Sequence, residues 1–320
     1  MEDTVISICT LTYNHEKFIS KAIESALVQK CSYKIEMIIS DDCSTDNTVE
    51  IIKEYAAKYP GIIKPIFNAK NLGPKKNNVQ CLTACTGKYI AGLEGDDYWT
   101  DTYKLQKQID FLESNPDFIV TGHNIKELTD GNYIIPEISV KDYTRLGLNN
   151  TGFSTPCYTC SLVWRNVINP WPDILYKSPI GDWIIISLLM ARGDLMIMPD
   201  VMGVYRKHTG MWSSQSRLNQ LNGIIQSIDL MLLYPEFDKF KQFKNHLALT
   251  KINYIKEAAL LTKDDETPLY ESELNTIKYF EDKIEELNSI FRNEQKLSEK
   301  VTLPVLIKAL QKKILKRVKK

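Results

Sequence analysis

Residues 5–10 read VISICT and residues 35–40 read IEMIIS, and both runs have the β-branched composition of buried strands. Between them, apolar residues recur at the spacing of one helix face, namely Phe18, Ala22, Ile23, Ala26 and Leu27. A strand, a helix and a second strand in this order predict a βαβ unit whose strands run parallel.

The same alternation continues to about residue 115. The further elements that we predict are a helix at Thr48–Tyr59, a strand at Ile62–Phe67, a helix from Pro74 to Ala84, a strand at Tyr89–Leu93 and a helix marked by Leu105, Ile109 and Leu112. We therefore expect an α/β protein with a mixed, mostly parallel sheet flanked by helices. Ligands of such sheets bind beyond the carboxyl ends of the strands, so the residues that follow each strand are candidates for a site.

The rest of the chain has two other patterns. Residues 116–222 are rich in aromatic residues, Gly, Pro and Asn, and we expect a loop-heavy region there. Residues 223–320 have a helical and highly charged pattern with a break at Asp264–Pro268. The sequence therefore predicts three parts, at residues 1–115, 116–222 and 223–320.

Composition and charge exclude several classes of protein. The 320 residues include 40 Lys and Arg and 40 Asp and Glu, whereas nucleic-acid-binding proteins usually have a basic excess, so we expect no nucleic-acid partner. No apolar run reaches the roughly 18 residues of a transmembrane helix, and the longest, Trp183–Met190, suits a buried segment. The start of the chain lacks the basic region of a signal peptide, and seven scattered cysteines are typical of reduced thiols, which predicts a cytoplasmic protein.

Cys157 and Cys160 form the one CxxC pair of the sequence, a pattern that zinc and redox sites also contain. A structural zinc site normally needs two such pairs or added histidines at close spacing. We therefore interpret the two cysteines as small buried residues.

Polar residues follow three of the predicted strands, in the segments Thr10–Asn14, Ser40–Asp46 and Leu93–Trp99. They bring a cluster of hydroxyl and aromatic groups and two carboxylate pairs to one edge of the sheet. Adjacent like charges repel unless a cation or a donor compensates them. Glu94, Asp96 and Asp97 offer the oxygen ligands that Mg²⁺ or Mn²⁺ prefers.

An Asp at a strand end is also a common helix cap or turn residue. For Asp46, which lies just before the helix at Thr48–Tyr59, we favour that structural interpretation. Three such segments at successive strand ends are harder to explain by caps alone.

These segments resemble the motifs of family-2 glycosyltransferases with the GT-A fold. The matching stretches are VISICTLTYN at 5–14, DDCSTDNT at 41–48, NLG at 71–73 with KN at 76–77, and GKYI at 87–90 with EGDD at 94–97. Shorter matches follow in GDW at 181–183 and VYRKH at 204–208. The chain departs from the family pattern at Glu94, where Asp is usual, and at Leu11, where Pro is usual.

The resemblance implies a metal-dependent, inverting glycosyltransferase that uses a nucleoside-diphosphate sugar, with UDP as the expected nucleotide. Its metal, Mg²⁺ or Mn²⁺, would be held by Asp96 and Asp97, with His208 as a further ligand. The donor-binding residues that it implies are Leu11, Thr12, Tyr13, Asp41, Asp42, Lys76, Glu94, Asp96 and Arg206. A solvated helix lysine remains an equal alternative for Lys76, and a structural or surface histidine remains one for His208.

Within that set, the resemblance implies that Tyr13 lies against the base and that Asp42 accepts a base N–H. Either Asp96 or Glu94 would face the ribose, and Arg206 would pair with the diphosphate. Residues 1–115 would then form the nucleotide-sugar half of the enzyme, and residues 116–222 the half that binds the acceptor.

Asp182 is the candidate catalytic base, because it matches the family position and is followed by an apolar run that would raise its proton affinity. The alternative is that Asp182 caps a helix at Trp183–Ala191. The resemblance further implies a glycan, lipid-linked or polymer acceptor in the synthesis of bacterial surface polysaccharides.

Residues 301–320 hold six Lys, one Arg and no acid, with an apolar stripe at helical spacing. Such a basic amphipathic helix can lie on the inner face of an anionic membrane, or it can pack on the protein with a solvated basic face. Both interpretations stay open, and an oligomer is compatible with the sequence.

Two other functions compete with glycosyl transfer. A sugar-nucleotidyltransferase should have a Gly-rich phosphate loop near its start, and residues 1–25 contain no Gly. A non-catalytic protein on a decayed transferase fold would not be expected to keep Asp42, Asp96, Asp97 and Asp182 together. The remaining histidines, His15, His123 and His246, belong to no recognisable constellation, and we assign them no role.

Overall fold

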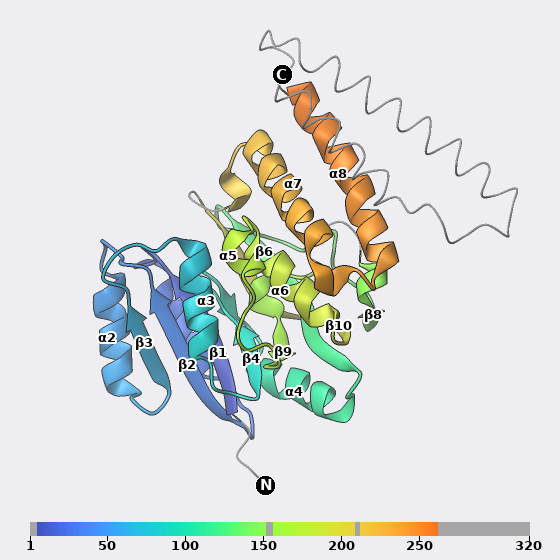
Figure 1. Cartoon of the computed structure of the whole chain (residues 1–320). Helices are drawn as coiled ribbons and strands as arrows, with labels where there is room; N and C mark the ends of the chain where they lie inside the picture. The colour runs from blue at the N-terminus through green and yellow to red at the C-terminus, as the bar shows by residue number, and fades with distance from the viewer. Residues whose placement is uncertain (1–4, 152–155, 209–211, 262–320) are drawn as a thin grey trace, which may run out of the picture. The chain divides into compact units, whose positions relative to one another are not determined.

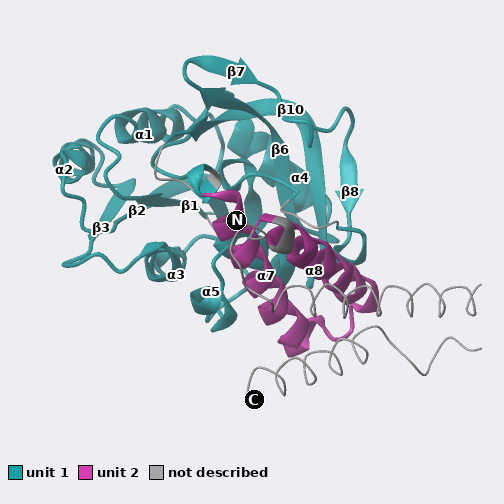
Figure 2. Cartoon of the chain, turned by 90° about the horizontal axis from the view of Figure 1, so that it is seen from above, with its two compact units in different colours: residues 1–215 teal, residues 216–320 magenta. Residues whose placement is uncertain are grey.

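The computed structural model describes residues 5–151, 156–208 and 212–261 of the chain. The chain has two compact units, residues 1–215 and residues 216–320 (Figure 2). The division predicted near residue 115 lies inside the first unit and stays a prediction.

A mixed sheet of ten strands, counted over the described residues, forms the first unit. The strands are β1 (Val5–Thr12), β2 (Lys34–Asp41), β3 (Ile63–Phe67), β4 (Tyr89–Gly92), β5 (Tyr98–Trp99), β6 (Phe118–Thr129), β7 (Asn132–Ile134), β8 (Thr144–Leu146), β9 (Val163–Arg165) and β10 (Asp194–Lys207). Their order is β3-β2-β1-β4-β9-β6-β10-β5, with β7 beside β6 and β8 beside β10. Strands β1 to β4 pair in parallel, as do β6 and β10, whereas β5, β7, β8 and β9 join antiparallel. The predicted α/β class with a mixed, mostly parallel sheet is confirmed.

Helices cover both faces of this sheet. They are α1 (Ile19–Leu27), α2 (Thr48–Lys58), α3 (Pro74–Ala84), α4 (Lys104–Ser114), α5 (Ile174–Lys177) and α6 (Gly181–Met190), with short 3₁₀ turns at Leu148–Asn150, Thr159–Ser161 and Trp212–Ser214. Figure 2 shows α1 and α2 on one face of the β1–β3 region and α3 on the other. The predicted strands and helices up to residue 93 are confirmed to within two residues at each end.

Part of the core of the first unit lies between the sheet and α1. The apolar residues that the sequence pattern placed on one face are buried there, with Ile6 and Ile8 of β1 and Ile19 and Ile23 of α1 all fully shielded from solvent. The apolar run of α6 is buried along its whole length from Trp183 to Met190, as predicted.

The expectation of a loop-heavy region at 116–222 is wrong, because the two longest strands of the sheet, β6 and β10, lie there (green in Figure 1). The first eight residues of β6 are all buried, so the strand has no alternation of apolar and polar residues. In β10 the pairing with β6 shifts register three times, which interrupts any regular period. Both features hide a strand from a search for periodicity.

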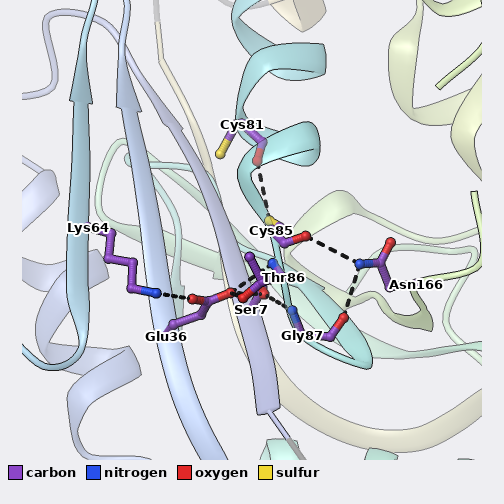
Figure 3. Close-up of polar contacts among 8 residues, drawn as sticks. All are labelled: Ser7, Glu36, Lys64, Cys81, Cys85, Thr86, Gly87 and Asn166. Carbon is purple, nitrogen blue, oxygen red and sulfur yellow. Dashed lines mark hydrogen bonds and ion pairs between the residues drawn. The ribbon is translucent and has the colours of Figure 1, made fainter. Parts of the chain in front are cut away.

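A buried glutamate ties three strands together at their amino ends (Figure 3). Glu36 of β2 is 4% exposed and accepts hydrogen bonds from Ser7 Oγ at 2.5 Å, from Thr86 N and Oγ1 at 2.9 and 2.8 Å, and from Lys64 Nζ at 2.5 Å. The Gly87 N–H donates to Ser7 Oγ at 2.7 Å. Burial opposes the ionisation of Glu36, but the bonds from Lys64, Ser7 and Thr86 outweigh it and lower its pKa to about 2.

The turn that carries Thr86 is fixed by Asn166, which directly follows β9. Asn166 Nδ2 donates to the carbonyl oxygens of Gly87 at 3.0 Å and Cys85 at 3.3 Å (Figure 3). Residues from β1, β2, β3 and the segment after β9 thus meet in one closed network of hydrogen bonds. We call this network the Glu36 network.

The second unit, so far as it is described, is a pair of helices, α7 (Arg217–Leu233) and α8 (Lys241–Leu261), joined through a 3₁₀ turn at Pro235–Phe237. Phe237, Phe243 and Leu247 are buried. The predicted helical character is confirmed up to residue 261. The break at Asp264–Pro268 and the basic helix at 301–320 lie outside the described residues. Across the described ranges, no helix combines the length and the apolar character needed to cross a membrane.

Candidate active site

The loop that follows β1 is locked onto the loop that follows β2. Asn14 has a φ of 55°, a conformation that Asn tolerates better than most residues. Its N–H donates to Ser44 Oγ at 2.9 Å, and its Oδ1 accepts from Thr45 N at 2.8 Å. The His15 N–H donates to Thr48 Oγ1 at 2.8 Å. The two loops therefore form one rigid edge beyond the carboxyl ends of β1 and β2.

The two aspartates at the end of β2 have different partners. Asp41 accepts from the N–H and the hydroxyl of Ser44, so it shapes the turn. Asp42 accepts from the backbone N–H groups of Leu72 at 2.7 Å and Gly73 at 2.9 Å. Its carboxylate is therefore fixed by the loop that follows β3, while the predicted contact of each aspartate with a donor stays a prediction.

Asp46 accepts hydrogen bonds at the start of α2, in agreement with the structural interpretation. The N-cap residue itself is Asn47, and Asp46 lies one position before it. Asp46 Oδ1 accepts from Thr48 N at 3.0 Å and Oγ1 at 2.5 Å, and its other oxygen accepts from Glu16 N at 3.0 Å.

Glu94, Asp96 and Asp97, which we call the acidic cluster, follow β4. Each offers a carboxylate oxygen, and the three oxygens lie within 4.8 Å of one another. Burial, followed by the charges of Asp96 and Asp182, raises the pKa of Glu94 to about 8. Burial, followed by the charges of Asp96 and Glu94, raises the pKa of Asp97 well above its usual range. Burial and mutual repulsion therefore oppose the ionisation of Glu94 and Asp97, and a nearby cation would favour their charged forms.

Strand β10 and the residue that follows it bring Arg206 and His208, from far along the chain, to the acidic cluster. Val204 pairs with Tyr98 in β5, which places Arg206 beside Asp97. The Arg206 N–H donates to Asp97 Oδ1 at 2.8 Å, and its guanidinium lies over the rings of Tyr98 at 4.7 Å and Phe18 at 5.1 Å. The backbone of Arg206 thus positions a site carboxylate, and its predicted contact with the diphosphate stays a prediction.

Two histidines face Asp96. His208 Nε2 lies 2.9 Å from Asp96 Oδ2, in the place beside the acidic cluster that the sequence predicted. His15 Nε2 lies 3.9 Å from the same oxygen, although the sequence assigned His15 no role. The signal that could have found His15 is its position directly after Thr12-Tyr13-Asn14. Burial opposes the ionisation of Asp96, but its bond to His208 and the charge of His15 outweigh it and lower its pKa.

These residues fit a divalent cation. The carboxylate oxygens of the acidic cluster lie close together, and His15, Asp96 and His208 form a second group whose ligand atoms lie within 4.8 Å of one another. Carboxylate and imidazole groups are the ligands that first-row divalent metals take in proteins.

Asp182 lies in the first turn of α6. Its Oδ1 accepts from Trp183 N at 2.7 Å, and the N-cap residue of the helix is Ile180. The alternative in which Asp182 caps this helix is therefore wrong. Burial raises the pKa of Asp182, and its charge in turn raises the pKa of Glu94, so the two carboxyl groups lie within electrostatic range of each other. A carboxylate with raised proton affinity is suited to accept a proton there.

The remaining predicted donor contacts lie along the same edge of the sheet. Tyr13 is 43% exposed, which leaves its ring available to a ligand, while Thr12 is buried at the end of β1 and Leu11 is partly buried. Lys76 lies exposed in the first turn of α3, where both of its interpretations remain open.

A lysine is buried behind the acidic cluster. Lys104 is fully buried, and its Nζ lies 3.9 Å from the ring centroid of Trp99, with no hydrogen-bond partner among the described residues. Burial lowers its pKa to about 7. Cys160 and Cys157 are buried and free, as predicted, and burial and the charge of Asp97 raise the pKa of Cys160.

Comparison with protein families and with individual sequences agrees with this geometry. The family model described as Glycosyl transferase family 2 matches residues 7–169. The uncharacterized protein Rv1520 of Mycobacterium tuberculosis is 34% identical over 211 residues, which are 65% of this chain and 61% of that protein. WfaP of Escherichia coli, named a UDP-Glc:α-D-GlcNAc-diphosphoundecaprenol β-1,3-glucosyltransferase, is 37% identical over 131 residues, which are 37% of this chain and 50% of WfaP. The chain thus spans about three fifths of the mycobacterial relative's length.

Solved structures share the fold. TarS of S. aureus, in a complex with UDP, has a TM-score of 0.57 at 17% identity and covers 83% of this chain and 76% of its own. The mannosyltransferase PcManGT of Pyrobaculum calidifontis, in a complex with GDP-Man and Mn²⁺, has a TM-score of 0.58 at 16% identity and covers 87% and 80%. The likeness confirms the predicted GT-A fold.

Proposed function

The chain belongs to glycosyl transferase family 2, and from this we propose that it transfers a sugar from a nucleoside-diphosphate sugar to a hydroxyl group, with inversion at the anomeric carbon. The observation that carries the proposal is the meeting of Asp42, the acidic cluster, His208 and Asp182 at one edge of the sheet. Each group has a chemical task in that reaction, and the tasks follow one another from the nucleotide to the acceptor.

Asp42 and Tyr13 would select the nucleotide, and we infer that it is UDP. Asp42 is held by two backbone N–H groups, so its carboxylate is pre-oriented to accept the N–H of a base. A site built on such a bond discriminates against bases that leave its buried groups unpaired. Two of the proteins similar to this chain support UDP, since TarS is solved with UDP and WfaP is named for UDP-Glc.

Asp96 and Asp97, with His208, would hold a divalent metal, either Mg²⁺ or Mn²⁺. When bound, such an ion acts as a Lewis acid that neutralises the charge on a departing diphosphate. Glu94 lies at the edge of the same cluster, where its longer side chain would reach the ribose. The Mn²⁺ in the PcManGT complex supports a metal in this chain.

Asp182 would be the general base. Its raised pKa suits the removal of a proton from the acceptor hydroxyl as that oxygen attacks the anomeric carbon. The bond between the anomeric carbon and the diphosphate oxygen breaks in the same displacement, and the nucleoside diphosphate leaves with the electron pair. A single displacement of this kind inverts the anomeric centre.

The acceptor that we propose is a glycan, a lipid-linked sugar or a polymer of the bacterial cell surface. WfaP, which is named for a diphosphoundecaprenol-linked acceptor, supports this class. We propose that the reaction takes place in the cytoplasm. Contact of residues 301–320 with the inner face of the membrane would bring the enzyme to a lipid-linked acceptor.

A screen of nucleotide-sugar hydrolysis, with calorimetry of UDP, GDP and CDP in the presence and absence of Mn²⁺, tests the proposal. We expect UDP to bind most tightly and only with metal, and one UDP-sugar to be hydrolysed fastest. The matched control is the Asp96→Ala/Asp97→Ala variant, which should lose metal-dependent binding. Equal binding by this variant and the wild type would refute the metal site, and failure to bind any nucleotide would refute the donor.

A further inference from the structure

Asp96 is approached by imidazole groups from two distant parts of the chain. His208 follows β10 and His15 follows β1, and their Nε2 atoms lie 2.9 and 3.9 Å from the same Asp96 oxygen. The two rings are perpendicular, with centroids 6.0 Å apart. Two atoms that each lie about 2.1 Å from one ion are roughly 3 to 4.2 Å apart, depending on the angle between them. Both observed separations fall within or just below that range.

His15 is held in this position by its backbone and by packing. Its N–H donates to Thr48 Oγ1 at 2.8 Å, and its ring packs edge-on against Phe18 with centroids 6.3 Å apart. The side chain is 17% exposed, and its Nδ1 is buried with no hydrogen-bond partner among the described residues. The ring therefore presents Nε2, rather than Nδ1, to the carboxylate.

Glycine at residue 95 lets the turn of the acidic cluster lie close to both Thr12 and His15. A Cβ at Gly95 would lie 2.9 Å from Thr12 Cβ and 3.0 Å from His15 Nδ1, closer than ordinary van der Waals contact. The Gly95 N–H donates to Leu11 O at 2.8 Å, which fixes this close approach. The loop after β1 and the acidic turn are thus fitted to each other around the imidazole.

We propose that His15 is a metal ligand together with Asp96 and His208, and that the site consequently takes a first-row transition ion such as Mn²⁺ in preference to Mg²⁺. The inference rests on the proposed function only for the presence of a metal at the acidic cluster. Imidazole nitrogen suits transition ions, whereas Mg²⁺ prefers carboxylate oxygen and water. Each added imidazole therefore strengthens the binding of Mn²⁺ more than the binding of Mg²⁺.

The test is pulsed electron paramagnetic resonance of the full chain loaded with Mn²⁺, first alone and then with UDP, because coordinated imidazole nitrogen modulates the Mn²⁺ echo. We expect the wild type to show two nitrogens, and His15→Asn and His208→Asn to show one each. Mn²⁺ affinity should fall by about 10–100-fold in His15→Asn, while Mg²⁺ affinity, measured by competition, should change by less than about threefold. His246→Asn, which alters a histidine of the second unit, is the matched control and should leave the spectrum unchanged.

An unchanged nitrogen signal in His15→Asn, or a wild type that binds no Mn²⁺, would overturn the inference. His15→Gln, compared by circular dichroism and thermal unfolding, keeps the test valid if the Asn variant misfolds. The two proposals fail separately. A two-nitrogen Mn²⁺ site without nucleotide-sugar hydrolysis would contradict the proposed function alone, and Mn²⁺-dependent hydrolysis with a one-nitrogen wild type would contradict the role of His15 alone.

Discussion

Two glutamates at opposite ends of the sheet show how differently the chain treats buried charge. Glu36, at the amino ends of the strands, receives hydrogen bonds from Ser7, Thr86 and Lys64, and its pKa is lowered to about 2. Glu94, at the carboxyl ends, is surrounded by other acids, and its pKa is raised to about 8. The amino end is satisfied by the chain's own donors and serves stability. At the carboxyl end, burial and the neighbouring acids oppose the ionisation of Glu94, and perturbed carboxyl groups of this kind cluster at functional sites.

The largest effect should come from a change at Asp182, the acid that we propose as the general base. Asp182→Asn keeps the size of the side chain and its acceptance of the Trp183 N–H, but it cannot take up a proton. We expect the rate of sugar transfer to fall by about 10²–10⁴, the usual worth of general base catalysis, while donor affinity stays within a few fold. Steady-state transfer kinetics and calorimetry measure the two quantities. Near-normal transfer by this variant would show that Asp182 is not the general base.

The matching change at the amino end should damage stability and spare chemistry. Glu36→Ala leaves Ser7 Oγ, the Thr86 N–H and Lys64 without their shared acceptor. We expect a loss of about 1–3 kcal/mol in the free energy of unfolding, because buried donors are left without an acceptor, with full donor affinity in the molecules that remain folded. Urea unfolding measures the loss, and Glu36→Gln, which keeps part of the network, is the milder control. A variant as stable as the wild type would show that the Glu36 network does not stabilise the fold.

The pH dependence of stability should have opposite signs at the two ends in the metal-free protein. The pKa of Glu36 is lowered from 4.5 to about 2 on folding, so its stabilising contribution is complete above pH 4.5 and is lost as pH falls towards 2. The pKa of Glu94 is raised from 4.5 to about 8, so its ionisation destabilises the fold above pH 8 and this penalty disappears as pH falls to 4.5.

Thermal unfolding from pH 2 to pH 9 tests this difference. Glu94→Gln should raise the free energy of unfolding by about 2 kcal/mol at pH 9, a discounted value for a shift of this size, and should have no effect at pH 4. Glu36→Gln should lower stability at pH 7 and have little effect near pH 2. If Glu36→Gln and Glu94→Gln both raised or both lowered the free energy of unfolding at pH 9, the comparison would be contradicted.

The smallest effect concerns Lys104, a buried charge that lies behind the carboxyl end but touches no ligand group of the site. Burial lowers its pKa from 10.5 to about 7. The charged form of Lys104 therefore destabilises the folded state most below pH 7. We expect Lys104→Met, which keeps the length of the side chain, to raise the free energy of unfolding by about 1 kcal/mol at pH 6 and by less at pH 9. Chemical denaturation at the two pH values checks this, and a loss of stability at pH 6 would show that the contact with Trp99 outweighs the burial.

The sequence predicted the part of the fold that follows a simple period. The strands up to Gly92 are short β-branched runs and the helices between them have one apolar face, so their order and their carboxyl edge could be inferred, and with them the acidic cluster. Strands β6 and β10 could not be inferred, because β6 is buried on both faces and β10 changes register with its partner.

The pairing of distant residues was also beyond the sequence. His15 and Asp96 meet because β1 pairs with β4 rather than with β3, and the order of strands in a sheet is not contained in the order of elements along the chain. Glu36 is a single acid in an apolar run, and its partners come from three separate segments. The motif match located His208 and Asp182, but the contact of His208 with Asp96 and the influence of Asp182 on Glu94 required the fold.

Gly95 also restricts how the sequence can change at this position during evolution. Since a Cβ at residue 95 would lie 2.9 Å from Thr12 Cβ and 3.0 Å from His15 Nδ1, a family member can gain a bulkier residue at this position only by moving the loop that carries both residues. Histidine after the Thr-Tyr-Asn triplet and glycine between the acids should therefore be kept or lost together as lineages diverge. The two positions are 80 residues apart in this chain, and together they would mark the branch of the family that uses a second imidazole.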